Sequence, residues 1–90
     1  MSGALTDFIG QIVVVDIDGP MVYLGTLAAV GGEFLALENV DVHNLGDSTT
    51  TRERYVIDAK KLGVRPNRKR AEVRIARVVG ISRLEDVIEF

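Results

Sequence analysis

Hydrophobic and polar positions along the chain follow the pattern of short strands separated by turns. Runs rich in Val, Ile, Leu and Tyr are bounded by Gly, Pro, Asn and Asp, which is typical of β-structure with tight turns. The pattern predicts five strands, at residues 11–18, 21–30, 33–42, 71–75 and 77–84. Turns are expected at 18–20, where Gly and Pro interrupt the ladder, and at the paired glycines 31–32.

Two of these strands allow finer predictions. Gly25 lies in the middle of the second run, where a glycine loses packing and gains conformational freedom, so a strong bend or bulge is expected there. In the third run, alternation predicts which side chains share a face. One face is expected to hold Phe34, Ala36 and Glu38, and the other Leu35, Leu37 and Asn39.

Two helical segments are expected beside the strands. Residues 5–9 predict a short leading helical turn that ends at the following glycine. A longer helix is expected at about 51–62, because Thr50 and Glu53 have the spacing of a capping box. Its apolar positions at helical spacing are Tyr55, Val56, Ala59 and Leu62, and Lys60, Lys61 and Gly63 favour its C-terminal end. Residues 54–58 are also compatible with the end of a strand.

The order of these elements predicts the fold class. Consecutive antiparallel strands with glycine bends are typical of a small barrel. We therefore expect an all-β protein with minor α-structure: a small, strongly bent, five-stranded antiparallel barrel with a short N-terminal helical turn. Residues 1–90 are expected to form a single domain, in which the long loop 43–69 before the last two strands contains the helix.

Composition adds expectations about assembly and location. Of the 90 residues, 47% are hydrophobic, and a domain of this size buries only roughly 60% of the surface that its unfolded chain exposes. Surplus apolar surface favours association with further copies, so a homo-oligomer is expected. The sequence has no secretory signal, no cysteine and no apolar run near the roughly 18 residues of a membrane span. A cytoplasmic protein without membrane contact is therefore expected.

The two halves of the chain differ in charge. Residues 1–51 contain seven acidic residues and no Lys or Arg, whereas residues 52–83 contain all 11 basic residues and three acidic ones. The last seven residues add three more acids, and the net charge is −2. Such asymmetry is found in nucleic-acid-binding proteins. It equally fits a head-to-tail assembly, in which the basic part of one copy meets the acidic part of the next.

A basic block at 63–74 is the candidate binding site. Together with a following arginine, its candidate nucleic-acid-binding residues are Arg65, Arg68, Lys69, Arg70, Arg74 and Arg77. Such side chains bind phosphate backbones without sequence preference, and salt weakens the binding steeply. Stacking aromatic residues would strengthen this hypothesis, but Tyr55 is the only one nearby. The alternative is a solvated loop that forms salt bridges between subunits.

Other polar clusters favour structural roles. Asp16 and Asp18 share a strand face, and we expect them at a solvated strand end, facing a neighbour's arginines. His43 has oxygen ligands nearby in Asp41, Asn44 and Asp47, but a single histidine favours a loop residue with one hydrogen bond over a metal site.

The rest of the sequence has no motif typical of nucleophilic catalysis or of phosphate binding. The hydroxyls of residues 48–51 have no base partner, so helix capping explains them. The glycines at 31–32 do not open a helix and lack a following lysine, which excludes a phosphate loop. No catalytic residue, metal or cofactor is therefore expected, and the protein is expected not to be an enzyme.

Two stretches of the sequence resemble the Sm and Sm-like (LSm) family. The first motif of that family is similar to Gly10–Val15, Tyr23–Leu27 and Leu35–Val40, and its second motif is similar to Val73–Ile81. The resemblance implies an SH3-like bent barrel of five strands whose last strands pair with a neighbour, so that copies close a ring. It also implies single-stranded RNA as a partner.

The resemblance has two departures in the loops that bind RNA in that family. Residues 30–34 lack the Asp and Asn of the uridine-binding loop, and Ile75 stands where the second motif has glycine. Arg74 matches the arginine of that motif and is the strongest single candidate. The expected RNA binding is therefore weak, salt-sensitive and not base-specific. A competing hypothesis is a structural or protein-interaction module, similar to PRC-barrel domains, that binds no nucleic acid.

Overall fold

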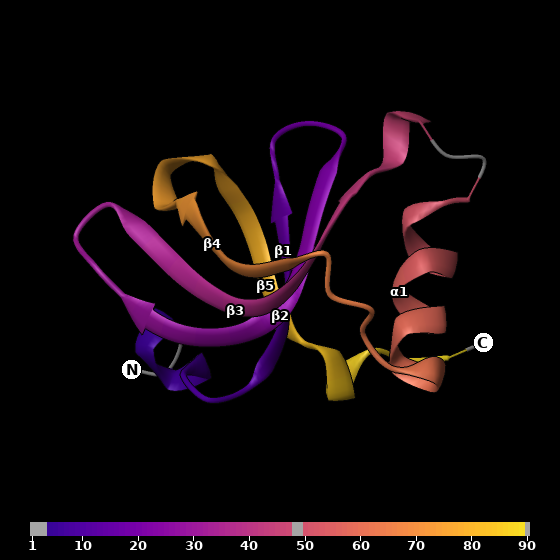
Figure 1. Ribbon diagram of the computed structural model, residues 1–90, viewed down its shortest axis with the longest axis horizontal. Coiled ribbons are helices and arrows are strands. Elements are labelled where there is room, and N and C mark those ends of the chain that lie inside the picture. The colour runs from indigo at the N-terminus through magenta and orange to yellow at the C-terminus, as the bar shows by residue number, and fades with distance from the viewer. Residues whose placement is uncertain (1–3, 48–49, 90) are drawn as a thin grey trace.

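A computed structural model describes residues 4–47 and 50–89 of the chain. These residues form one sheet of five antiparallel strands in the order β4-β3-β2-β1-β5 (Figure 1). The strands are β1 (Ile12–Ile17), β2 (Met21–Val30), β3 (Phe34–Asn44), β4 (Arg68–Arg74) and β5 (Val78–Arg83). The five predicted strands are confirmed, although β3 continues two residues past its predicted end and β4 begins earlier than predicted.

The helical segments also agree with the sequence pattern. The only α-helix of the described residues is α1 (Arg52–Leu62), so the alternative of a strand at 54–58 is wrong. Short 3-10 turns lie at Leu5–Phe8, Leu45–Asp47, Ile75–Arg77 and Leu84–Asp86. The leading turn is the predicted one, and Gly10 follows it with φ 87°, a value that glycine adopts without strain.

The N-cap of α1 differs from the prediction by one residue. The cap is Thr51, whose hydroxyl accepts a hydrogen bond of 3.2 Å from the backbone N–H of Arg54. Thr50 was expected in this role because the Thr50–Glu53 spacing matches a capping box. The C-terminal end is as predicted: Gly63 has φ 94° and its N–H donates to the Ala59 carbonyl.

A bend in the sheet is centred on Gly25, as predicted. The pairing of β2 with β3 changes register between Leu24 and Thr26, and a Cβ at Gly25 would lie 3.0 Å from the Glu38 carbonyl oxygen. On the facing strand Asn39 has φ 52°, in the left-handed region. This kink reverses the alternation, so Asn39 is exposed and Val40 is fully buried. The prediction that Asn39 shares a face with Leu35 and Leu37 is therefore wrong.

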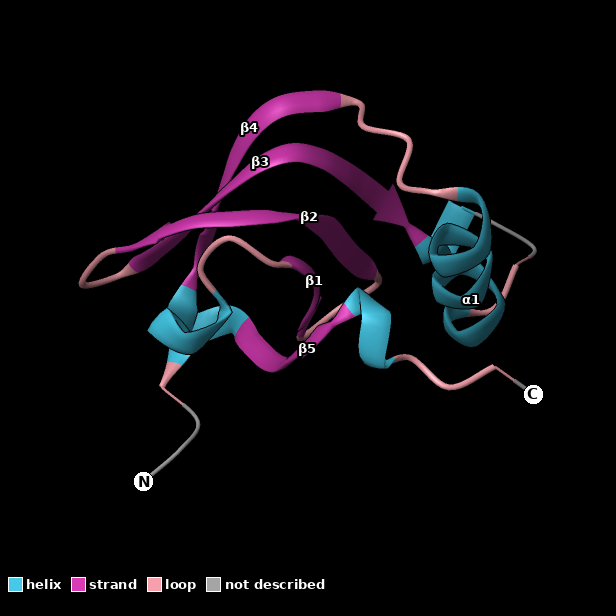
Figure 2. Cartoon of the chain, turned by 90° about the horizontal axis from the view of Figure 1, so that it is seen from below, coloured by secondary structure: helices cyan, strands magenta, loops and turns pink. Residues whose placement is uncertain are grey.

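Both faces of the sheet are covered by apolar packing. The inner cluster consists of Val13, Val15, Leu27, Leu35, Leu37, Val40 and Val73. On the other face, α1 packs through Val56 and Ala59 against Val14, Val22 and Leu24. Figure 2 shows the helix beside one end of the curled sheet. Of the apolar positions at helical spacing, Leu62 is 73% exposed, whereas Ile57, which is not one of them, is buried.

The two outer strands of the sheet do not pair with each other. Within the described residues, β4 pairs with β3 and β5 pairs with β1, and each has one edge without a strand partner. The structure is therefore a bent, open, five-stranded sheet with one helix. No helix among the described residues is long and apolar enough to cross a membrane.

Candidate functional site

The edge strand β4 contains most of the predicted basic site. Its residues alternate between the two faces, so Val73 is buried and Ala71 partly buried while the charged residues remain exposed. The register places Arg74 opposite Phe34, Arg70 opposite Glu38 and Arg68 opposite Val40. Four of the predicted basic residues therefore lie in an edge strand rather than in a loop, while Arg65 lies on its approach and Arg77 follows in the 3-10 turn Ile75–Arg77.

Asn67 fixes the place where this strand begins. Its side chain accepts a hydrogen bond of 3.0 Å from the Val42 N–H and donates one of 3.0 Å to the Val42 carbonyl. Its backbone N–H donates to the Val40 carbonyl over 2.9 Å. The hydrogen bonds of Asn67 thus extend the pairing with β3 beyond the start of β4. They align the following basic residues beside β3.

Several of the predicted basic residues are paired with acids of the same chain. Arg70 lies 3.7 Å from Glu38, and Arg74 lies 3.2 Å from Glu33. All four side chains are at least half exposed, so each pair contributes at most about 1 kcal/mol and remains open to exchange.

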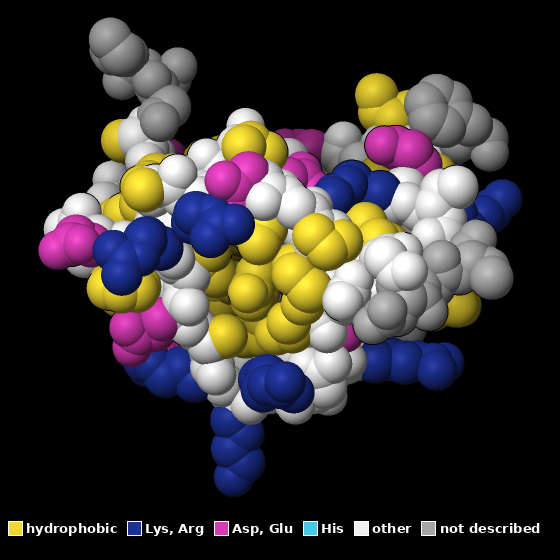
Figure 3. All heavy atoms as spheres, turned by 90° about the horizontal axis from the view of Figure 1, so that it is seen from above, with side chains coloured by type: hydrophobic (Ala, Val, Ile, Leu, Met, Phe, Trp, Pro, Cys, Tyr) yellow, Lys and Arg dark blue, Asp and Glu magenta, His cyan; other side chains and the backbone are white. Residues whose placement is uncertain are grey.

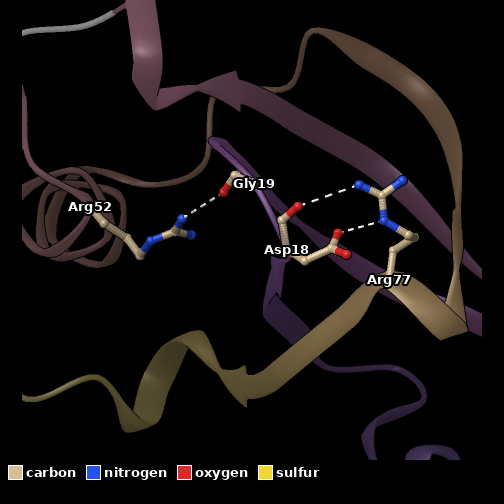
Figure 4. A network of polar contacts seen from close by, with 4 residues as sticks. All are labelled: Asp18, Gly19, Arg52 and Arg77. Atoms are coloured by element: carbon tan, nitrogen blue, oxygen red, sulfur yellow. Dashed lines mark hydrogen bonds and ion pairs between the residues drawn. The ribbon is translucent and has the colours of Figure 1, made fainter.

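Arg77 has a structural role. Its Nε lies 2.5 Å from Asp18 Oδ1, and an Nη donates to the Asp18 carbonyl at 3.4 Å (Figure 4). From the opposite side, Arg52 donates to the Gly19 carbonyl at 3.4 Å and pairs with Asp16 at 2.6 Å. The two arginines hold the β1–β2 turn between them. Asp16 and Asp18 were expected to face a neighbour's arginines, and this is corrected: their partners belong to the same chain.

A second group of cations has no acidic partner. Among the residues that the structure describes, Arg65, Arg68 and Lys69 form no ion pair with a carboxylate, and Arg68 only donates to the Asn67 carbonyl at 3.1 Å. All three residues are exposed. Uncompensated positive charge is therefore concentrated where the chain enters β4.

Phe34 is a site residue that the sequence analysis missed. The Arg74 guanidinium lies over its ring, 5.0 Å from the centroid, in a cation–π arrangement. Phe34 is 38% exposed at the start of β3. The signal in the sequence was an aromatic residue directly after the Gly31-Gly32 turn, but its partner lies far away along the chain and only the strand register joins them.

Apolar surface reaches the outside of the molecule at the two edge strands. Ala71 on β4 and Val78 and Ile81 on β5 pack against the inner cluster but stay partly exposed. Figure 3 shows apolar side chains gathered in a hollow, with Lys and Arg side chains at its rim. Val79, also on β5, is 70% exposed.

His43 lies in β3, so the prediction of a loop histidine is wrong. Its ring stacks on Tyr55 of α1 with centroids 4.1 Å apart, and its buried Nε2 has no hydrogen-bond partner among residues 4–47 and 50–89. The Tyr55 hydroxyl donates a short hydrogen bond to Asp41. Burial, with help from this carboxylate, raises the pKa of Tyr55 far above its usual value of about 10.

The oxygen-bearing residues that neighbour His43 in the sequence have other partners in the structure. Asn44 Oδ1 accepts a hydrogen bond of 2.8 Å from the Gly46 N–H. The side chain of Asp47 and residues 48–49 lie outside the described part. Within that part, no group of three or more His, Cys, Asp or Glu side chains could hold a metal ion.

Comparisons with known proteins give similar solved structures but no family. The sequence matches no protein-family model, and it matches no curated protein. A chain in a solved structure, "Crystal structure of the NatC complex bound to CoA", is similar in fold, with a TM-score of 0.57 and 21% sequence identity. The similarity covers 90% of this chain and 84% of that one. At this identity it supports the small β-rich fold and nothing further.

Proposed function

We propose that the protein is an Sm-like assembly module, non-enzymatic, that joins other protein chains through the edges of its bent sheet. Features of the described fold support the proposal: the leading turn before β1, the glycine bend in β2 and the antiparallel strand pairing that the family resemblance implies. In this proposal the bent sheet remains open in the single chain, and its outer strands β4 and β5 pair with strands of other chains. Where every partner is a second copy, a ring is the simplest closed assembly.

The observation that carries the proposal is the pair of unpaired strand edges. A free edge presents backbone N–H and C=O groups that can pair with a strand of another chain. Beside these edges the inner apolar cluster is partly exposed, and Val79 adds exposed apolar surface on β5. Strand addition would satisfy the backbone and cover this surface in one step.

The experiment is native mass spectrometry of the purified protein and of Val79→Glu. The charge on the β5 edge is expected to shift the protein from an oligomer to a monomer without loss of fold, as checked by circular dichroism. Leu62→Glu is the matched control, because Leu62 is equally exposed but lies at the end of α1. A monomeric parent protein, or equal effects of both changes, would refute self-assembly through this edge.

A second candidate function is binding of single-stranded RNA at the basic edge. It is favoured by the cation–π pair of Arg74 and Phe34, which offers a planar surface beside exposed cations. Changing Arg68, Lys69 and Arg70 together to Ala tests it. Loss of oligouridine binding with the oligomer intact supports this function, and so does extra mass in native spectra that nuclease removes. Unchanged RNA binding refutes this site.

A further inference from the structure

The free edge of β4 differs from that of β5 in charge, and this difference bears on what can pair with it. Arg70 and Arg74 are compensated by Glu38 and Glu33, so the excess positive charge lies at the start of the strand. That excess comes from Arg65, Arg68 and Lys69, which have no carboxylate partner in the described part of the chain. Exposed cations of this kind attract an acidic partner and set its direction.

The alternation of side chains along β4 sets a second requirement for a strand that pairs with it, besides negative charge. Val73 is 4% exposed and Ala71 is partly buried, so both side chains face the inner apolar cluster, while Lys69, two positions before Ala71, is exposed. A strand added beside β4 would direct every second side chain of its own to the same side. The edge thus fits a strand in which apolar residues alternate with carboxylates.

A second copy of this chain fits that requirement poorly. Its own free strand β5 contains no acidic residue and ends in Arg83. If the start of antiparallel β4 faced the end of that β5, Arg68 would lie near another cation, and like charges across a strand pair are destabilising. Charge therefore favours a different protein over self-pairing at β4.

We propose that the free edge of β4 binds an extended acidic segment of another protein, in which carboxylates alternate with apolar residues. This rests on the proposed role as an assembly module and specifies the partner of one of its two edges. Carboxylates on one face of the added strand would meet Arg68, and apolar residues on its other face would cover the inner cluster beside Ala71 and Val73. Lys69 lies on the face of Ala71, at the end of this apolar surface, so it would meet a carboxylate at the end of the segment, and Arg65 adds positive charge on the approach to β4.

The test uses a short fluorescent peptide of alternating Val and Glu, with a Val and Lys peptide as its counterpart. Fluorescence anisotropy measures the binding of each to the full chain. We expect only the acidic peptide to bind, and the triple variant R65E/R68E/K69E to bind it at least about tenfold more weakly. The control variant R54E/K61E, which alters exposed cations on α1, is expected to bind it as the parent does.

Backbone amide shifts in NMR spectra locate the peptide, and we expect the largest changes over 68–74. Equal binding of both peptides, equal weakening in the control variant, or shifts centred elsewhere would overturn the proposal. Two further outcomes would replace it. Oligouridine binding that the charge reversal abolishes, without acidic-peptide binding, would assign this edge to RNA. Dissociation of a homo-oligomer by the charge reversal would assign the β4 edge to a second copy of the chain.

The two proposals can fail separately. If Val79→Glu dissociates the oligomer while the charge reversal leaves peptide binding unchanged, the assembly module stands and the acidic partner does not. If the peptide binds β4 as expected and the parent protein is monomeric at every concentration, the acidic partner stands and assembly of identical copies does not.

Discussion

At the scale of single residues, the bend of the sheet depends on the close approach of β2 and β3. Gly25 gives the space for this approach, because a Cβ there would lie 3.0 Å from the Glu38 carbonyl oxygen and 3.2 Å from the Val40 Cα. Asn39, with φ 52°, completes the kink on the facing strand. These two residues turn Val40 into the core, where it is fully buried.

Gly25→Ala is expected to lower the free energy of unfolding by about 1–2 kcal/mol, because backbone atoms of β3 must move away from the new methyl group. Urea denaturation measures the change. Gly32→Ala is the control: a Cβ there has no neighbour within 4 Å and its φ is not positive, so a change within about 0.5 kcal/mol is expected. Equal losses at both positions would contradict the tight approach at Gly25.

Tyr55 gives a prediction about pH. Its pKa is raised in the folded state, so in the unfolded chain the hydroxyl ionises first, at about pH 10. The unfolded chain therefore binds fewer protons above that pH, and the contribution of Tyr55 to stability, present below it, is lost as the pH rises. Tyr55→Phe is expected to cost about 1–2 kcal/mol at neutral pH, through the lost hydrogen bond to Asp41.

The same variant should lose less stability than the parent protein between neutral pH and pH values above about 10. Urea denaturation at both pH values measures this difference, and Tyr23 serves as an internal control because it is present in both proteins. The same alkaline loss in parent and variant would show that Tyr55 is not the group responsible.

At the scale of elements, α1 is attached to the sheet by a small apolar contact and a few polar ones. Its buried residues are Val56, Ile57 and Ala59. The Lys60 ammonium donates to the Val87 carbonyl, which joins the helix to the segment that follows β5. Helices of this length are marginal by themselves in water, so packing and capping together determine whether α1 forms.

Thr51→Ala is expected to destabilise α1 by about 1 kcal/mol, because the Arg54 N–H loses its acceptor at the first turn. Amide hydrogen exchange in α1 should accelerate more than exchange in the central strands β1 and β2. Thr51→Ser keeps the hydroxyl and is expected to restore the parent's protection. If the serine variant behaves like the alanine variant, the hydroxyl is not the relevant group.

At the scale of the whole molecule, the charge asymmetry of the sequence is largely compensated within one chain. Four ion pairs join acids of the first half to arginines of the second: Arg52–Asp16, Arg70–Glu38, Arg74–Glu33 and Arg77–Asp18. They lie at the β1–β2 turn and along β3 and β4. The remaining cations at the start of β4 are the part of the asymmetry that is free to act on a partner.

Because the side chains of three of these four pairs are at least half exposed, salt should affect stability and binding differently. Raising NaCl to about 0.5 M is expected to change the free energy of unfolding by less than about 1 kcal/mol. Binding of an anionic partner at β4 should weaken severalfold over the same range. Urea denaturation and peptide anisotropy at both salt concentrations measure the two effects. A loss of several kcal/mol in stability would contradict the low contribution assigned to the surface pairs.

The sequence by itself determined the elements, because their signals are local. Strand alternation, the turns at 18–20 and 31–32, the bend at Gly25 and the helix ending at Gly63 all follow from residues within a few positions of one another. The errors were also local: the cap at Thr51 lies one residue from the prediction. The face of Asn39 was wrong because its left-handed backbone has no signal in an alternating pattern.

Only the tertiary structure decided which of the basic residues form ion pairs with acids of the same chain and which have no carboxylate partner in the described part. Arg74 and Glu33 are 41 positions apart in the sequence, and Arg77 and Asp18 are 59 apart. The stack of His43 on Tyr55 and of Arg74 on Phe34 likewise needs two elements to be brought together. Contacts across such distances depend on strand register and helix docking, which arise from the packing of the whole core and not from any short segment.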